Sequence, residues 1–167
     1  MKGALVTGAT TPVGAAIVAQ LLKDQVASPV LAVGAESYED VKGLFPQPEV
    51  IYVQADLTRS RELRTLLFAP AKAHNVETVI HTALHRAAHA TGSRVHQLNV
   101  ESTRELLRLC EDHPTIRTFV LRSHAEIYRV RAVEPEIIDE RQKILGSGKE
   151  NDKGIERCRK YMIDQPD

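Results

Sequence analysis

The sequence has 167 residues, with 22 Lys or Arg balanced by 22 Asp or Glu, so its formal net charge is zero. This balance excludes general attraction to nucleic acid or anionic lipid, and no apolar run approaches the length of a membrane span. The first residues, MKGALVTGATTP, are also too short and too interrupted for a signal peptide. We expect one cytoplasmic domain over residues 1–167, with no nucleic acid and no membrane among its partners.

Apolar runs and amphipathic stretches alternate along the first 121 residues. In chain order, the pattern predicts a strand at 4–6, a helix at 13–22, strands at 29–33 and 50–53, a helix at 60–74, a strand at 76–82, a helix at 99–112 and a strand at 116–121. Strands that are apolar throughout and alternate with amphipathic helices predict a doubly wound α/β domain. We expect a parallel sheet of about five strands with helices on both faces.

Two details qualify this pattern. Pro70 should end or kink the helix at 60–74, and a turn-rich stretch that contains Gly43, Pro46 and Pro48 precedes the strand at 50–53. The pattern weakens after Tyr128.

Cys110 and Cys158 have neither CxxC nor metal-ligand spacing, which indicates buried structural thiols in a reducing compartment.

The stretch Thr7-Gly-Ala-Thr-Thr-Pro-Val-Gly14 lies between the first strand and the first helix. Its glycines allow a tight turn, and the following helix presents free amides and its dipole to a pyrophosphate. Thr11 occupies the place of a third glycine, and Pro12 lacks an N–H group. The hydroxyls of Thr10 and Thr11 and the amide of Val13 are the remaining expected donors. Many such turns use glycine for geometry alone, so a purely structural role stays open.

Five stretches in chain order resemble the landmarks of the extended short-chain dehydrogenases/reductases, the NAD-dependent epimerase/dehydratase group. TGATTPVG is similar to the family's TGxxGxxG loop, ADL to its acidic residue after the third strand, VIHTA to its VIHxAA strand, NVESTRELL to its NVxGTxNLL helix and FVLRSHAEIY to its FVYxSSxxVYG motif. The resemblance covers residues 1–128 and implies a Rossmann fold that binds NAD or NADP.

The resemblance also assigns a cofactor site. Its residues are Gly8, Thr10, Thr11, Pro12, Val13 and Gly14 in the loop, Asp56 and Leu57 at the adenine, and Thr82 and Ala83 after the fourth strand. An acidic residue about 20 positions beyond the glycines normally binds the ribose hydroxyls of NAD, whereas a nearby Arg favours NADP. Position 34 is glycine, and Glu36 follows two residues later without an adjacent Arg. We therefore expect NAD as the cofactor, with Glu36 as its ribose ligand or as an ordinary solvated acid.

The family's catalytic residues do not occur at the matching positions. His124 stands where the family has a catalytic Ser or Thr, with Ser123 one place earlier, and Ile155 and Arg159 stand at the Tyr and Lys of YxxxK. Hydride transfer at a carbon that bears oxygen needs a proton partner for that oxygen. Isoleucine cannot supply it, and His124 is the remaining candidate acid or base. We assign no catalytic residue.

Histidines and arginines near this region have two interpretations each. His85 and His89 are spaced to share one helical face, as in zinc sites, but no third ligand adjoins them, so we assign no metal site. The resemblance makes His81, His85, His89 and His96 the polar rim of a pocket. The basic residues Arg122, Arg129 and Arg131 form either a phosphate-binding edge or a solvated face.

Three functions remain open. The chain is a dinucleotide-binding protein without family-type catalysis, or an active NAD(P)-dependent oxidoreductase or epimerase that acts on a sugar nucleotide or another small hydroxy or keto substrate as part of a longer chain. The third possibility is an assembly module that binds no cofactor. Residues 129–167 are atypical of the family, and the chain ends before a family-type substrate lobe. By resemblance, a homodimer or a partner domain is expected.

Overall fold

The structure is a computed structural model that describes residues 2–84 and 93–123. The chain divides into two compact units, Met1–Val120 and Leu121–Asp167, and only residues 121–123 of the second unit are described. A single domain over residues 1–167 stays a prediction. None of the described helices is long and apolar enough to cross a membrane.

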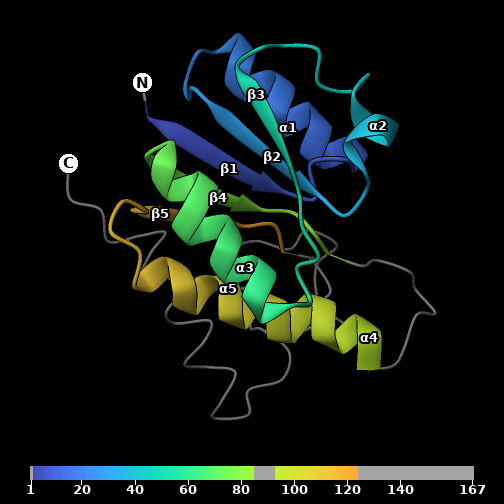
Figure 1. The fold of residues 1–167 in the computed structure, drawn as a ribbon, viewed down its shortest axis with the longest axis vertical. Helices are drawn as coiled ribbons and strands as arrows, with labels where there is room; N and C mark the ends of the chain where they lie inside the picture. Colours follow the sequence, from blue (N-terminus) through green and yellow to red (C-terminus); the bar gives the residue numbers. More distant parts are fainter. Residues whose placement is uncertain (1, 85–92, 124–167) are drawn as a thin grey trace, which may run out of the picture. The chain divides into compact units, whose positions relative to one another are not determined.

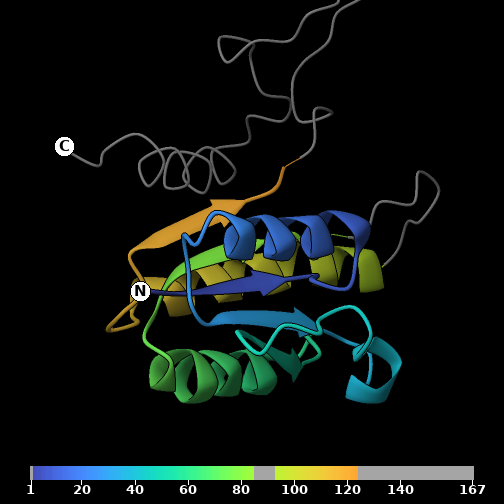
Figure 2. The ribbon, with the colours of Figure 1, turned by 90° about the horizontal axis from the view of Figure 1, so that it is seen from above.

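Five strands form one sheet in the order β3-β2-β1-β4-β5 (Figure 1). Their bounds are Gly3–Thr7 for β1, Val30–Gly34 for β2, Val50–Gln54 for β3, Val76–His81 for β4 and Thr118–Leu121 for β5. β1 pairs in parallel with β2 and β4, and β2 pairs in parallel with β3. Figure 2 shows β1 and β2 running in the same direction. The predicted parallel sheet is confirmed, and its order reverses between β1 and β4, the place where ligands bind in such sheets.

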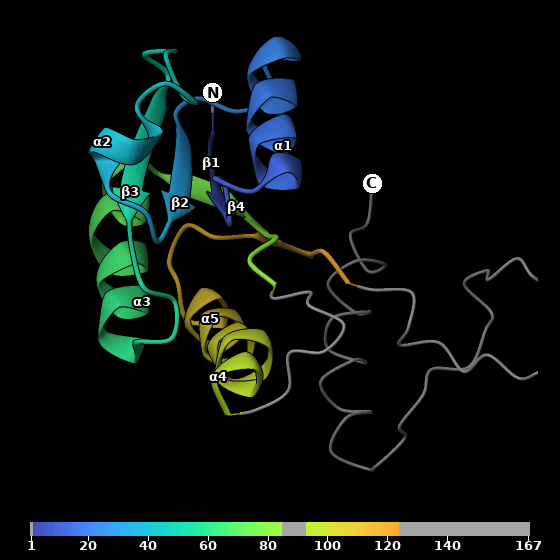
Figure 3. The same cartoon turned by 90° about the vertical axis from the view of Figure 1, so that its right-hand side faces the viewer.

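Helices cover both faces of the sheet, as predicted. They are α1 (Pro12–Lys23), α2 (Tyr38–Val41), α3 (Ser60–Leu66), α4 (Ser93–His96) and α5 (Ser102–Glu111). A π-helical turn at Leu67–Ala71 follows α3, and another at Gln97–Glu101 joins α4 to α5. Figure 3 shows α1 on one face of the sheet and α3 on the other.

Alternation along the strands divides the core between the two faces. On the α1 face, Val6 of β1 and Ala32 of β2 belong to one buried cluster with Val18 of the helix. The intervening residues, such as Leu5 and Leu31, are fully buried on the opposite face. Because both faces are covered, every residue of β1 and β2 is buried, which explains their uninterrupted apolar runs.

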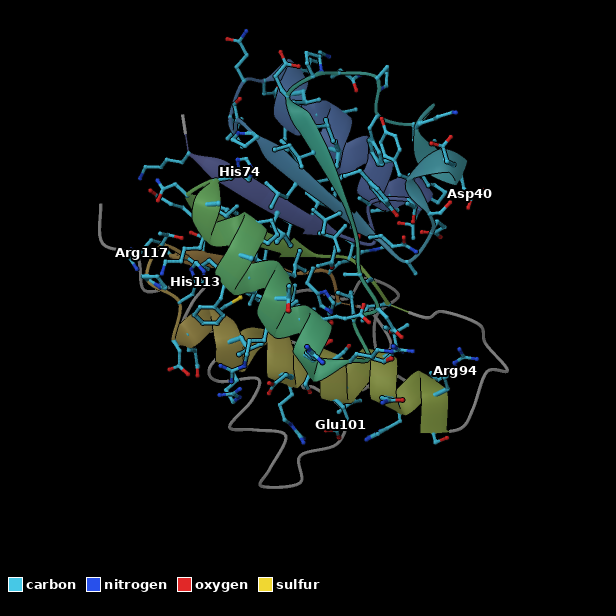
Figure 4. The ribbon with its side chains drawn as sticks, in the orientation of Figure 1. Asp40, His74, Arg94, Glu101, His113 and Arg117 are labelled. Carbon is cyan, nitrogen blue, oxygen red and sulfur yellow. The ribbon has the colours of Figure 1, made fainter. Side chains whose placement is uncertain are left out.

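Pro70 neither ends nor sharply breaks its helix. The chain widens into the π turn at Leu67–Ala71 and remains helical to residue 73. This turn accommodates a residue that has no N–H and whose ring crowds the preceding turn. The carbonyl of Leu67 accepts a hydrogen bond from Nε2 of His113 at 2.9 Å. His113 is buried where the end of α5 approaches this turn (Figure 4).

Two helical segments differ from the predicted pattern. The short helix α2 lies in the stretch that we expected to be turn-rich, and Ser37 before it donates a hydrogen bond to Asp40 at 2.6 Å. The helix predicted from residue 99 begins at Ser93. Residues 93–98 read SRVHQL and have too few apolar positions to show helical periodicity, so the sequence did not reveal this extension.

Replacing Leu63 by Ala tests the packing of α3 on the sheet. The Leu63 side chain is 1% exposed, and its truncation should lower the free energy of unfolding by about 2–5 kcal/mol because it removes buried contacts and leaves a cavity. Urea unfolding followed by circular dichroism measures this loss. Val26 is 63% exposed, and Val26→Ala should change the same quantity by less than about 0.5 kcal/mol. Equal losses in the two variants would contradict the assigned core.

Candidate functional site

Two glycines allow the loop between β1 and α1 to lie close to the end of β4 and to the first turn of α1. Gly8 has a positive φ of 65°, and a Cβ atom there would lie 2.9 Å from the backbone of Ala83, which follows β4. A Cβ atom on Gly14 would lie 2.7 Å from the carbonyl carbon of Gly8. Both contacts are too short for a real side chain. The glycines therefore set the approach of the loop to its own helix and to the end of β4.

Thr11 fits the position where the family motif has a glycine because its backbone is extended, with φ −74° and ψ 155°. Its hydroxyl accepts a hydrogen bond from the Gly14 amide at 3.1 Å and donates one to the Gly8 carbonyl at 2.8 Å. Thr11 is therefore the N-cap of α1. The hydroxyl proton that we expected to be available to a phosphate is used within the loop.

The amides that remain at the start of α1 are few. Pro12 has no N–H, and the Ala9 amide donates to the Val33 carbonyl at 3.0 Å. Within residues 2–84 and 93–123, the amides of Thr10 and Val13 have no hydrogen-bond acceptor. Unpaired amides at a helix N-terminus attract anions. The loop thus keeps two potential phosphate donors.

The end of β2 brings an acidic side chain to the same loop. A Cβ atom on Gly34 would lie 2.7 Å from Cγ2 of Thr10 and 2.9 Å from Oε2 of Glu36. The Glu36 carboxylate therefore lies beside the position at which the family carries its acidic residue, although it comes two residues later in the chain. The glycine at position 34 leaves the space in which this carboxylate fits.

Two residues of β3 contact the loop after β2, and the sequence analysis did not identify them. The Tyr52 hydroxyl donates to the Glu36 carbonyl at 2.7 Å, and the Gln54 side-chain amide donates to the Ala35 carbonyl at 3.1 Å. Burial raises the pKa of Tyr52, and so do the charges of Glu36 and Asp40. Asp40 lies on α2 (Figure 4). A sequence signal existed, since two polar side chains at alternate positions end an otherwise apolar strand.

Asp56 lies two residues after the end of β3, at the start of the turn into α3. Its Oδ1 accepts hydrogen bonds from the Thr58 hydroxyl at 2.7 Å and the Thr58 amide at 3.0 Å. Its Oδ2 lies 3.2 Å from the Arg59 guanidinium. The bonds from Thr58 and then the charge of Arg59 lower the pKa of Asp56. The carboxylate is therefore ionised at neutral pH, and it retains lone pairs for a ligand. Its neighbour Leu57 is buried.

Residues at the end of β4 are bonded to β1. The Thr82 hydroxyl donates to the Thr7 carbonyl at 2.7 Å, and the Thr82 amide donates to the Thr7 hydroxyl oxygen at 3.2 Å. Thr82 is 1% exposed. Its polar groups thus join the two strands at the switch point, and the backbone of Thr82 and Ala83 adjoins Gly8 of the glycine loop.

His81 is fully buried and does not form the rim of a pocket, contrary to our expectation. Its Nδ1 lies 2.6 Å from the Thr7 hydroxyl and its Nε2 lies 2.9 Å from the Thr103 hydroxyl. Burial lowers the pKa of His81 to about 4, so the imidazole is neutral at pH 7. The imidazole of His81 thus links its own strand, β4, to Thr7 of β1 and to Thr103 of α5. Each of its two ring nitrogens has a partner from a different element.

Some of the other residues predicted from the sequence lie outside the part of the chain that the structure describes. They are His85, His89, His124, Arg129, Arg131, Ile155, Cys158 and Arg159. His96 is exposed and lies 3.2 Å from Glu101, and Ser123 is exposed. Among the described residues, no group of three or more His, Cys, Asp or Glu side chains is arranged to hold a metal ion. Cys110 is buried, which raises its pKa to about 12.

A cavity of about 400 Å³ lies between β3 and α3, away from the glycine loop. Apolar side chains of β3 and α3 contribute to its lining, together with polar residues at the start of α3. The lining residues are Val53, Gln54, Ala55, Arg59, Arg61, Glu62, Thr65, Leu66 and Pro70. None of the glycine-loop residues is among them, whereas Ala55 precedes Asp56 and Arg59 pairs with it, so this cavity lies beside Asp56 and not at the glycine loop.

Replacing Gly14 by Ala tests the contact between the loop and α1. The added methyl group would strike the Gly8 carbonyl, so we expect the free energy of unfolding to fall by about 1–3 kcal/mol. A Cβ atom on Gly43 meets nothing within 4 Å, and Gly43→Ala should change stability by less than about 0.5 kcal/mol. Urea unfolding of both variants provides the measurement. A Gly14→Ala protein as stable as wild type would rule out the close contact.

The buried His81 predicts acid sensitivity. Its pKa is about 4 in the folded protein and about 6.5 in an unfolded chain, so the unfolded state binds more protons between these values. The contribution of the neutral His81 to the free energy of unfolding is therefore full above pH 6.5. It falls as the pH drops, by about 2 kcal/mol between pH 7 and pH 5. Urea unfolding at the two pH values measures this loss. In His81→Gln, which cannot be protonated, this part of the loss should disappear, and an unchanged loss would contradict the prediction.

Comparisons with known proteins agree with this architecture. The family model described as NAD dependent epimerase/dehydratase family matches residues 4–144. No curated protein matches the chain. Among solved structures, UDP-glucuronic acid 4-epimerase from Bacillus cereus, in complex with UDP-glucuronic acid and NAD, has a TM-score of 0.69 and 18% identity over 97% of this chain and 52% of that one.

Two further structures are similar at the level of the fold. dTDP-glucose 4,6-dehydratase from Bacillus anthracis, in complex with NAD, has a TM-score of 0.66 and 21% identity over 84% of this chain and 43% of that one. Yeast methylglyoxal/isovaleraldehyde reductase, complexed with NADPH, has a TM-score of 0.65 and 18% identity over 76% of this chain and 38% of that one. The chain thus spans about half of their length or less. By the match of its family model, the chain belongs to the NAD dependent epimerase/dehydratase family.

Proposed function

We propose that this chain binds NAD or NADP at the carboxyl ends of β1 and β2, through the loop that precedes α1. The observation that carries the proposal is a backbone cradle in which Gly8, Gly14 and Gly34 each leave space that a Cβ atom would fill. The cradle brings the N-terminus of α1 and the Glu36 carboxylate to the same end of the sheet. Such an arrangement suits a ligand that carries both a phosphate and a ribose.

Each part of a dinucleotide has a proposed partner. The amides of Thr10 and Val13, at the N-terminal end of α1, would bind the pyrophosphate, and Pro12 and Thr11 would shape the turn around it. Asp56 and Leu57 would contact the adenine, with Thr82 and Ala83 at the end of β4 forming the adjoining backbone. When bound, the nicotinamide ring supplies hydride transfer. The chain's own described residues bind and orient the cofactor.

We propose NAD as the preferred cofactor. A carboxylate accepts hydrogen bonds from two ribose hydroxyls, whereas a 2′-phosphate would face its negative charge. Glu36 lies beside Gly34 and Thr10, and the charges of Glu36 and Asp40 both act on nearby Tyr52. This negative field favours a neutral ribose over a phosphorylated one.

Binding without family-type catalysis agrees best with the sequence. Ile155 and Arg159 replace the Tyr and Lys that the family motif uses for proton transfer, and His124 replaces its Ser or Thr. Isoleucine has no proton to exchange. The alternative is an active oxidoreductase or epimerase that acts on a sugar nucleotide or another small hydroxy or keto substrate as part of a longer chain. The similar solved enzymes are about twice as long as this chain, so a longer polypeptide or a partner domain would supply the missing part of such an enzyme. A cytoplasmic location and a homodimer are further proposals.

Titration of the purified chain with NADH and with NADPH, followed by nicotinamide fluorescence, tests the proposed binding. We expect NADH to bind with a dissociation constant below about 1 mM. Gly14→Ala should weaken binding because the shifted loop misplaces the Val13 amide, and Gly43→Ala is the matched control that should bind as wild type does. Absence of saturable binding of both nucleotides in the wild-type chain would refute the proposal and favour an assembly module.

A further inference from the structure

The loop between β2 and α2 is held by side chains of the neighbouring strand. The Tyr52 hydroxyl donates to the carbonyl of Glu36 at 2.7 Å, and the Gln54 amide donates to the carbonyl of Ala35 at 3.1 Å. Two consecutive carbonyls are thus fixed by residues that alternate along β3 and share one face of the sheet. The backbone that carries the Glu36 carboxylate has its direction set from outside the loop.

The Tyr52 ring is itself fixed in place. It stacks on Phe45 with ring centroids 6.1 Å apart and lies at 40° to Tyr38 with centroids 6.5 Å apart. It also packs against the buried cluster between α1 and the sheet. Aromatic contacts of this kind restrict a side chain to one orientation. The hydroxyl therefore reaches the Glu36 carbonyl from an anchored ring.

Gly34 is the residue that makes this arrangement possible. A Cβ atom there would lie 2.7 Å from the Tyr52 hydroxyl oxygen, as well as 2.9 Å from the Glu36 carboxylate. An acidic side chain at position 34 would have to displace both groups. The glycine at 34, the tyrosine at 52 and the acid at 36 therefore depend on one another, and together they move the carboxylate from the end of the strand into the loop.

We infer that Tyr52, supported by Gln54, is a positioning residue that holds Glu36 for ribose recognition and thereby sets the preference for NAD over NADP. The inference rests on the proposed function, because it concerns the same site. A carboxylate held in one place binds the ribose hydroxyls and repels a 2′-phosphate. If the loop is released, the carboxylate binds the ribose hydroxyls less well and repels a 2′-phosphate less strongly. Both changes reduce the difference in affinity between NAD and NADP.

The test is the ratio of the NADPH and NADH dissociation constants in Tyr52→Phe, which keeps the aromatic ring and removes only the hydroxyl. Loss of one hydrogen bond should raise the NADH dissociation constant about 3–10-fold, while the NADPH constant stays the same or falls. Glu36→Gln should reduce the ratio as well. The double variant should reduce it no further than Glu36→Gln alone, because Tyr52 acts through Glu36.

Two further variants keep the test decisive. Tyr38→Phe removes the hydroxyl of a ring that is 60% exposed and should leave the ratio at its wild-type value. Gln54→Met, on the exposed end of β3, removes the bond to Ala35 and should lower the ratio even if Tyr52→Phe fails to fold. If Tyr52→Phe weakens the binding of NADH and NADPH equally, the role of Tyr52 is merely structural and the inference is overturned. The same outcome in Gln54→Met overturns it if Tyr52→Phe does not fold.

The outcomes separate this inference from the proposed function. A wild-type chain that binds neither nucleotide refutes the proposed function and, with it, the inference. A wild-type chain that binds NADH but whose ratio is unchanged by Tyr52→Phe and by Gln54→Met leaves the proposed function standing and refutes the inference alone. A wild-type preference for NADPH also refutes it, because the carboxylate would then not exclude the additional phosphate.

Discussion

The contact between Gly14 and Gly8 is the constraint on which the rest of the candidate site depends. Because no side chain separates them, α1 begins directly against the turn that ends β1. This contact fixes the direction in which the first amides of α1 project, and it brings Thr10 next to Gly34. A larger residue at position 14 would push the start of α1 away from this turn, and a larger residue at position 8 would strike the backbone of Ala83 after β4.

Buried polar bonds at the switch point hold the strands that carry these glycines. Thr7 of β1 bonds His81, the last residue of β4, and Thr82, which follows it, and His81 in turn bonds Thr103 of α5. Among the described residues, every buried side-chain nitrogen and oxygen has a hydrogen-bond partner. Such fully satisfied networks favour a single arrangement of the elements that they join. The position of Ala83 against Gly8 follows from that arrangement, since Ala83 comes directly after the bonded Thr82.

Local chemistry and long-range contacts explain which features could be predicted from the sequence. The apolar runs of β1 and β2 reveal a sheet that is covered on both faces, and the loop before α1 reveals a tight turn, because both signals are contained in neighbouring residues. The role of Thr11 as an N-cap and the tyrosine that holds Glu36 were not predicted. Tyr52 and Glu36 are 16 residues apart, and their contact exists only after β3 has paired with β2.

Pro70 and His113 show the same limit. The proline predicts a disturbance of its helix, but not the hydrogen bond that a carbonyl of the widened turn accepts from His113, which is 46 residues from Leu67. His81 was assigned to a pocket rim because the resembled family places this region at its cofactor and substrate. Its actual surroundings are Thr7 and Thr103, which the fold brings to it from both sides.

The cap that Thr11 places on α1 has a consequence for the kinetics and thermodynamics of ligand capture. A loop with its own internal hydrogen bonds is ordered in the free protein, so a ligand that binds there need not order it and would lose little affinity to conformational entropy. Association can then proceed at the rate set by diffusion and orientation, without waiting for a rearrangement. The same preorganisation withholds the Gly14 amide from the ligand. The loop thus offers a ligand one amide fewer, but it is already ordered before the ligand arrives.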